Sequence, residues 1–293
     1  MKEMLFILNP KAGTKKANKV LVDILNIFNR AHYNVQVYVT AGAKDAISAV
    51  KEFAPGKDLV VCCGGDGTFN ETVTGLLESG LDLPIGYIPA GSTNDFANSI
   101  GLPSSLTDAA ERIVSGTPTR LDVGRFGDRY FCYVSSFGAF SRASYSTSQN
   151  AKNTFGHVAY LLEGISELSQ IRKKNMRFEL DGEVLEDEYI FGAVCNSTSL
   201  GGILTIDPNQ VDMSDGMFEV MLIRAPRDLS ELTECIIALQ KQQYNCRMMS
   251  FRSVREVKVT ANKDIFWTLD GEKGPNDTEI HISNLHHAIQ LIK

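Results

Sequence analysis

The 293-residue sequence lacks any uninterrupted apolar run of about 20 residues, the length that a membrane-spanning helix requires. The apolar run near the N-terminus is only about five residues long and ends at the polar Asn9-Pro10, so it does not resemble a signal peptide. We therefore expect a cytoplasmic protein. If it meets lipid, we expect peripheral and transient contact at the inner membrane surface.

Positive charge is also scarce. The 29 Lys and Arg residues face 35 Asp and Glu residues, and the net charge of −6 excludes a basic nucleic-acid-binding surface. The six cysteines form no C-x-x-C pair and no zinc-binding spacing. A chain of this length needs no disulfide bonds to fold, so reduced thiols are expected. The oligomeric state stays open, a homodimer included.

Three well-known nucleotide-binding signatures are missing. The sequence has no Walker GxxxxGK[ST] motif, no protein-kinase HRD and DFG set, and no GxGxxG motif. These absences argue against P-loop enzymes, protein kinases and dinucleotide-dependent oxidoreductases.

The first 120 or so residues alternate between strand and helix patterns. Four apolar runs have the character of buried strands: Met4–Asn9, Val35–Val39, Asp58–Cys63 and Ile85–Pro89. Helical spacing follows each of them, ending with a short helix from Asp95. This alternation predicts an α/β fold over residues 1–122, a doubly wound parallel sheet of the nucleotide-binding kind.

The pattern changes near Arg120. Strand patterns such as RYFCYVSSF (129–137) then follow one another, interrupted by two helical stretches, Thr154–Arg172 and Asp228–Tyr244. This order predicts an antiparallel β-sandwich domain over residues 123–285. The apolar tail 286–293 is expected to return to the first domain as a strand.

Three loops are predicted at one edge of the parallel sheet, because the carboxyl ends of parallel strands share an edge. They are Asn9–Gly13, Gly64–Thr68 and Pro89–Asp95. Each contains glycine, and two lead into helix N-termini that attract phosphate. Each loop alone could be an ordinary turn or helix cap. Asp66 and Asp95 would repel phosphate, so Mg²⁺ is expected between them and a nucleotide.

At this point the sequence resembles a known family. GGDGTFNE (64–71) with PAGSTNDFA (89–97) resembles the diacylglycerol kinase catalytic domain family, specifically its bacterial soluble lipid kinases. Two later stretches, 200–223 and WTLDGE (267–272), are similar to further motifs of that family. The resemblance implies an ATP- and Mg²⁺-dependent lipid kinase with diacylglycerol as the leading substrate. Phosphatidylglycerol, a sphingoid base and an undecaprenol-like alcohol stay open as acceptors.

The resemblance also implies roles for particular residues. The nucleotide site would take Asn9, Pro10, Lys11, Ala12, Gly13, Thr40, Gly65, Asp66, Gly67, Thr68, Phe69, Asn70, Glu71 and Ser92. Asp66 and Asp95 would join a water-linked Mg²⁺ network. Asp215, with the backbone carbonyls of Asp212 and Met217, would hold a second, structural Mg²⁺. Thr14 stands where the family often has lysine, and Lys15 is the nearest alternative cation.

Glu272, with Asp270 beside it, would be the general base of the reaction. The sequence LDGE occurs twice, however, at Leu180–Glu183 and Leu269–Glu272, and Asp-Gly between apolar residues predicts a tight hairpin in both cases. Only the order of motifs in the family selects the second copy.

Two further points complete the predictions. His286 and His287 are not expected to bind a metal together, because neighbouring side chains on a strand point to opposite faces. The alternatives to a lipid kinase are a NAD kinase, which shares the GGDG loop and takes a soluble substrate, and a non-catalytic nucleotide- or lipid-binding protein.

Overall fold

The structure is a computed structural model that describes residues 1–138, 173–200, 204–206, 211–241, 243–244 and 246–293. The chain forms two compact units. Unit 1 comprises residues 1–122 and 287–293, and unit 2 comprises residues 123–286. The helix predicted over Thr154–Arg172 lies outside the described residues.

Unit 1 is built on a parallel sheet with the strand order β2-β1-β3-β4. Its strands are β1 (Lys2–Leu8), β2 (Tyr33–Val39), β3 (Leu59–Gly64) and β4 (Pro84–Pro89). The last residues of β17 (Glu279–Ile292) pair in parallel with β4, which is the return strand that the apolar tail predicts. β3 is buried along its whole length because helices cover both faces of the sheet, and this burial explains its continuous apolar sequence.

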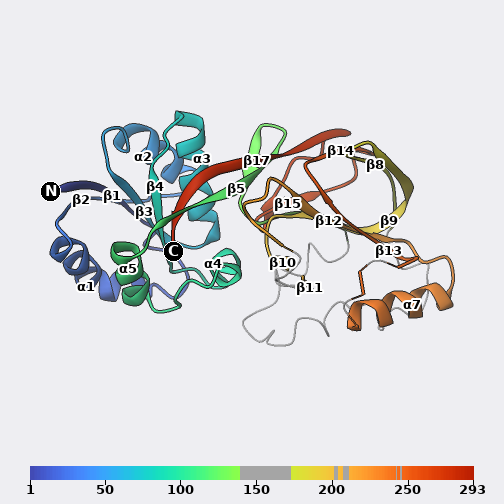
Figure 1. The fold of residues 1–293 in the computed structure, drawn as a ribbon, viewed down its shortest axis with the longest axis horizontal. Coiled ribbons are helices and arrows are strands. Elements are labelled where there is room, and N and C mark those ends of the chain that lie inside the picture. Colours follow the sequence, from blue (N-terminus) through green and yellow to red (C-terminus); the bar gives the residue numbers. More distant parts are fainter. Residues whose placement is uncertain (139–172, 201–203, 207–210, 242, 245) are drawn as a thin grey trace. The chain divides into compact units, whose positions relative to one another are not determined.

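Helices α1 (Lys16–Arg30) and α5 (Leu106–Ser115) cover one face of this sheet, and α2 (Asp45–Phe53) and α3 (Asp66–Ser79) cover the other (Figure 1). The short helix α4 (Asp95–Ser99) follows β4, as predicted. Helix α5 was missed in the sequence, although it carries a start signal. The Ser105 side chain accepts the Asp108 N–H, the arrangement that a Ser-x-x-Asp sequence favours.

Unit 2 consists of antiparallel strands around one apolar core. The long strand β9 pairs with β8 along its first half and with both β7 and β12 along its second half. The strands are β5 (Pro118–Phe126), which begins in unit 1, and β6 (Arg129–Phe131), β7 (Val134–Gly138), β8 (Lys174–Leu180), β9 (Glu183–Cys195), β12 (Phe218–Arg224), β13 (Met249–Val254), β14 (Glu256–Ala261), β15 (Trp267–Leu269), β16 (Glu272–Lys273) and the first part of β17. A separate pair, β10 (Ser199–Leu200) and β11 (Leu204–Thr205), forms a second small sheet.

Aromatic rings fill the core of unit 2. The rings of Phe137 and Trp267 lie 4.9 Å apart, and Phe126 packs edge-on against the same Trp267. Helix α7 (Leu229–Gln240) confirms the helix predicted from Asp228, which caps it by accepting the Glu231 N–H. In the described part of the chain, no helix is long and apolar enough to cross a membrane.

One predicted strand is in fact two. The sequence RYFCYVSSF suggested a single strand over 129–137, but β6 ends at Phe131 and β7 starts at Val134. At the break, the N–H groups of Cys132 and Tyr133 donate to the Asp270 carboxylate. A distant side chain has therefore replaced part of the strand's own hydrogen bonding.

Candidate active site

The three predicted loops meet at the carboxyl edge of the unit 1 sheet. The Asn9 N–H donates to the Cys63 carbonyl at 2.9 Å, and the Ala90 N–H donates to the Gly64 carbonyl at 2.7 Å. Backbone hydrogen bonds thus tie all three loops to β3 or its end.

Glycine is needed at this edge because the loops touch each other. A Cβ on Gly91 would lie 2.7 Å from the Gly65 Cα, and a Cβ on Gly13 would lie 2.5 Å from the Ala90 carbonyl oxygen. Gly65 has an ordinary φ of −89°, so a side chain there is disfavoured by crowding, a Cβ lying 3.2 Å from the Gly91 Cα, and not by a left-handed backbone. Gly67 lies within the first turn of α3 rather than in an open loop.

Asp66 connects two of the loops. Its Oδ2 accepts the Asp95 N–H at 2.9 Å, and its Oδ1 accepts the Tyr87 hydroxyl at 3.3 Å. As the first residue of α3, its carboxylate also lies at the positive end of the helix dipole. Burial raises the pKa of the neighbouring Asp95. A cation bound beside these two carboxylates would offset that cost, so their environment fits Mg²⁺.

Asn9 links the first loop to α3. Its Nδ2 donates to the Thr68 Oγ1 at 2.9 Å, and its Oδ1 accepts the Lys11 N–H at 3.0 Å. The Lys11 ammonium in turn donates to the Ala41 carbonyl at 3.3 Å. Lys15 is exposed and has a left-handed φ of 59° where α1 begins. Whether Lys15 acts in place of a lysine at position 14 stays a prediction.

Two predicted nucleotide contacts have other roles for their side chains. Phe69 is fully buried, with its ring centroid 4.5 Å from Tyr87 and 4.9 Å from Phe96, so the ring is part of the core. The Glu71 carboxylate accepts the Lys44 N–H at 2.6 Å and the Ala46 N–H at 3.3 Å. It therefore caps the N-terminus of α2 and fixes the segment after Thr40.

The remaining predicted nucleotide residues lie on the same edge. Thr40 is buried at the end of β2 and donates its N–H to the Leu8 carbonyl. The others sit on the loops or near the start of α3: Pro10, Ala12, Asn70 and the exposed Ser92.

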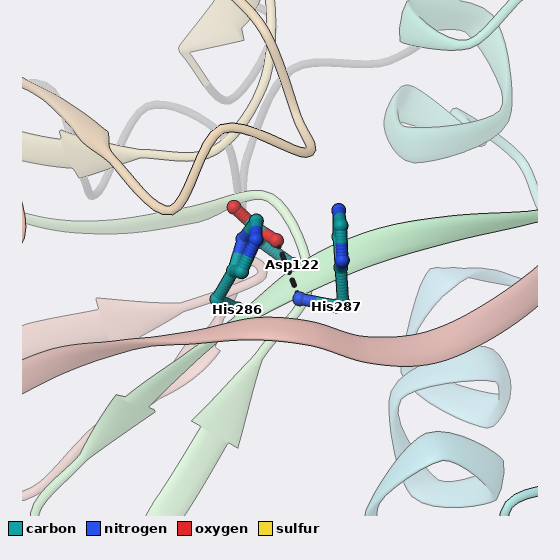
Figure 2. Close-up of side chains that lie close together, drawn as sticks. All are labelled: Asp122, His286 and His287. Carbon is teal, nitrogen blue, oxygen red and sulfur yellow. Dashed lines mark hydrogen bonds between the residues drawn. The ribbon is translucent and has the colours of Figure 1, made fainter.

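A further buried carboxylate of unit 1 escaped the sequence analysis. Asp122 is 2% exposed, and its Oδ1 accepts the His287 N–H at 2.7 Å (Figure 2). His287 has a left-handed φ of 54°. The strand geometry assumed for His286 and His287 is therefore interrupted, and the argument that their side chains point apart fails there. The signal in the sequence was weak, because the strand TRLDVGRF also carries Arg120 and Arg125.

The predicted catalytic pair belongs to unit 2. Residues Leu269–Glu272 form the turn of the β15–β16 hairpin, in which Asp270 and Gly271 have left-handed φ values of 48° and 81°. The Asp270 carboxylate is buried and accepts the N–H groups of Cys132, Tyr133 and Val134 at 2.6, 3.0 and 3.0 Å.

Glu272 lies two residues further on, and its side chain differs completely. It is exposed and has no hydrogen-bond or salt-bridge partner among the described residues. The geometry thus separates the pair: Asp270 anchors the hairpin, and Glu272 offers a free carboxylate.

The predicted structural metal residues form a tight turn before β12. The Asp212 Oδ1 accepts both the N–H and the hydroxyl of Ser214, and the Asp215 Oδ1 accepts the Met217 N–H at 2.9 Å. The Met217 carbonyl accepts the Asn284 Nδ2 at 2.9 Å. Asp212 and Asp215 are both exposed.

Glu219, just beyond this turn, was also missed. It is only 2% exposed, and burial together with the charge of Asp215 raises its pKa to about 8. Its Oε2 is buried without a hydrogen-bond partner. A charged residue inside the apolar run MFEVMLI marks it in the sequence. A buried carboxyl oxygen without a partner, beside Asp215, fits a cation at the Asp212–Met217 turn, because a bound cation would favour the ionised form of Glu219.

Comparison with known families assigns both halves of the chain. The profile of the diacylglycerol kinase catalytic domain matches residues 3–126. The profile of the YegS C-terminal NAD kinase beta sandwich-like domain matches residues 134–292. The two matches together span most of the sequence.

Individual relatives agree with this assignment. A diacylglycerol kinase of Bacillus subtilis (strain 168) is 31% identical over 276 residues, which cover 94% of this chain and 91% of the relative. A diacylglycerol kinase of Staphylococcus epidermidis is 28% identical over 97% of this chain and 90% of the relative. The crystal structure of a diacylglycerol kinase from Bacillus anthracis aligns with a TM-score of 0.76 over 99% of this chain and 96% of that one, at 23% identity. The α/β unit followed by a β-sandwich unit is thus the fold of this group.

Proposed function

The chain belongs to the diacylglycerol kinase family, and on that premise we propose that it transfers the γ-phosphoryl group of ATP to the hydroxyl of a membrane lipid. The acceptor we propose is diacylglycerol, which would give phosphatidic acid. The observation that carries the proposal is the joined edge of unit 1, where Asp66 holds two glycine-containing loops together at a helix N-terminus. Such an edge suits the phosphates of a nucleotide.

Unit 1 would bind the nucleotide. The glycines let the loops pack closely against one another, and Asn9 and Thr68 hold the first loop against α3. Asp66 and Asp95 would hold a nucleotide-linked Mg²⁺. Bound there, Mg²⁺ would neutralise charge on the phosphate oxygens during transfer.

Unit 2 would supply the base. The free Glu272 carboxylate would take the proton of the lipid hydroxyl as its oxygen bonds to the γ-phosphorus. The bond from that phosphorus to the β–γ bridging oxygen would break, and ADP would leave. Asp270 would act as a positioning residue, because its buried carboxylate accepts the N–H groups of residues 132–134. A structural Mg²⁺ would be held by Asp215 and the carbonyls of Asp212 and Met217.

A lipid-acceptor panel tests this proposal. Purified protein is incubated with radiolabelled ATP, Mg²⁺ and vesicles that contain diacylglycerol, phosphatidylglycerol, a sphingoid base or undecaprenol, with NAD as a soluble acceptor. We expect labelled phosphatidic acid and no labelled NAD product. Labelling of NAD alone, or of no acceptor, would overturn the proposal; labelling of another lipid would overturn only the choice of diacylglycerol.

A matched glycine pair tests the nucleotide edge within the same assay. Gly91→Ala places a methyl group 2.7 Å from the Gly65 Cα, whereas a Cβ at Gly42 meets nothing within 4 Å. We expect Gly91→Ala to weaken ATP binding at least about tenfold, since the loops must separate. Gly42→Ala should bind ATP as the unaltered protein does. Equal ATP affinity in both variants would place the nucleotide elsewhere.

A further inference from the structure

Glu219 is a charged residue in a position that should be apolar. It lies on β12, where its neighbours Phe218 and Val220 enter the core of unit 2. Its own side chain points to the opposite face and yet is only 2% exposed. An ionised carboxylate out of water is strongly unfavourable unless a cation or several donors compensate it.

The described surroundings of Glu219 supply little compensation. Its ladder partners on the neighbouring strands are the neutral residues Cys195 and Ser253. The Ser253 side chain favours the charged form of Glu219, but Oε2 has no hydrogen-bond partner. The charged groups that act on it are Asp215 and Asp212, which have the same sign. The cluster therefore has negative charge in excess.

A second buried oxygen without a partner lies at the same turn. The Asn284 Nδ2 donates to the Met217 carbonyl, and this bond fixes the orientation of the amide group. The Asn284 Oδ1 is then an acceptor, and it is buried with no donor. The turn is thus flanked by two unpartnered oxygens in addition to its own carboxylates. Oxygen atoms in excess of donors are the surroundings that hard divalent cations prefer.

We propose that Glu219 helps to hold a hard divalent cation, Mg²⁺ or Ca²⁺, at the Asp212–Met217 turn, with its buried Oε2 facing the ion or an ion-bound water. This inference rests on the structural metal site of the proposed function and adds to it a group from inside the strand. Water screens the charges of the exposed Asp212 and Asp215, whereas the buried carboxylate of Glu219 would act on the ion without that screening. The ion in turn makes burial of Glu219 tolerable.

The test is direct metal binding to the full chain without nucleotide. Mn²⁺ is titrated into chelator-treated protein, and the free ion is measured by electron paramagnetic resonance. We expect Glu219→Gln to weaken the site at Asp215 at least about tenfold, the usual effect of removing a supporting group near a metal. Thermal unfolding in EDTA should show the variant to be as stable as the unaltered protein or more so, because the amide, unlike the carboxyl group of Glu219, has no charged form that burial penalises. Adding Mg²⁺ should stabilise the unaltered protein more than the variant.

Two further variants make the outcome decisive. Asp215→Asn should remove one bound Mn²⁺, and Glu186→Gln, an exposed glutamate on β9, should bind like the unaltered protein. Mn²⁺ affinity of Glu219→Gln within twofold of the unaltered value would overturn the inference. Unchanged Mn²⁺ binding by Asp215→Asn would overturn the metal site itself, independently of whether lipid is phosphorylated. If Glu219→Gln does not fold, Glu219→Asp, which keeps the charge on a shorter side chain, should still weaken Mn²⁺ binding about threefold or more.

Discussion

The two LDGE turns of unit 2 have the same backbone and different surroundings. In both, the aspartate and the glycine have left-handed φ values, 47° and 99° at Asp181 and Gly182, and 48° and 81° at Asp270 and Gly271. In both, the aspartate carboxylate accepts backbone N–H groups from another segment. The sequence LDGE is therefore a way of building an anchored hairpin, and by itself it has no catalytic meaning.

The glutamates are what distinguish the two turns. Glu183 forms a two-pronged ion pair with Arg252, at 2.9 and 3.0 Å. Glu272 has no such partner among the described residues. A carboxylate held by arginine is a poor base, because the pair stabilises its charged form. A free carboxylate on an anchored turn can accept a proton from a substrate.

The largest expected effect is on turnover. Glu272→Gln should lower kcat about 10²–10⁴-fold, the usual cost of losing a general base, with ATP affinity unchanged. Glu183→Gln should leave kcat within about twofold, because its carboxylate serves only an ion pair. The measurement is kcat at saturating ATP and lipid. A reversed result, with Glu183 essential, would show that the wrong hairpin had been assigned to catalysis.

An intermediate effect is expected from the aspartates. Asp270→Asn should lower the free energy of unfolding by about 3 kcal/mol, because an amide cannot accept all three buried N–H bonds. Its kcat should fall less than in Glu272→Gln, since the base is retained on a looser turn. Asp181→Asn, on the exposed hairpin, should cost about 1 kcal/mol. Urea unfolding of both variants measures the difference; equal costs would mean that burial of Asp270 contributes nothing.

The smallest effect depends on pH. The hydrogen bond from Arg252 holds the pKa of Glu183 below the ordinary 4.5. The ion pair therefore stabilises the fold fully above pH 4.5, and this stabilisation is lost as the pH falls through the lowered pKa. Glu183→Gln should therefore be less stable than the unaltered protein by under about 1 kcal/mol at pH 7, and equal to it in acid. Glu272→Gln should show no such loss at pH 7. A pH-independent difference for Glu183→Gln would contradict the ion-pair explanation.

Features of this structure that depend on neighbouring residues can be predicted from the sequence, whereas features that depend on residues far apart in the chain cannot. Strands such as β1 and β3 follow from local apolar runs, and the two hairpin turns follow from Asp-Gly. The break between β6 and β7 does not, since it depends on Asp270, 138 residues beyond Cys132. The residues of RYFCYVSSF alone give no indication that Asp270 will bind the backbone there.

The candidate site divides in the same way. The glycine-containing loops were recognisable because backbone crowding limits the residue type locally. The separate roles of Phe69 and Glu71 were not, because the stack on Tyr87 and the cap on α2 form only when other elements pack beside them. Glu219 stands out in the sequence as a charge within the apolar strand MFEVMLI, whereas Asp122 lies in a strand that also carries Arg120 and Arg125 and gives no comparable signal.

The pairing of β17 with β4 has a consequence for biosynthesis. Gln290 and Leu291 pair with Pro84 and Ile85, and Leu291 is fully buried in unit 1. During translation, β1 to β4 leave the ribosome long before these residues do, and domains generally fold as they emerge. The edge of β4 that pairs with β17 therefore stays without its partner strand until unit 2 has been synthesised. Unit 1 is the first to begin folding and cannot finish until nearly 300 residues have been made.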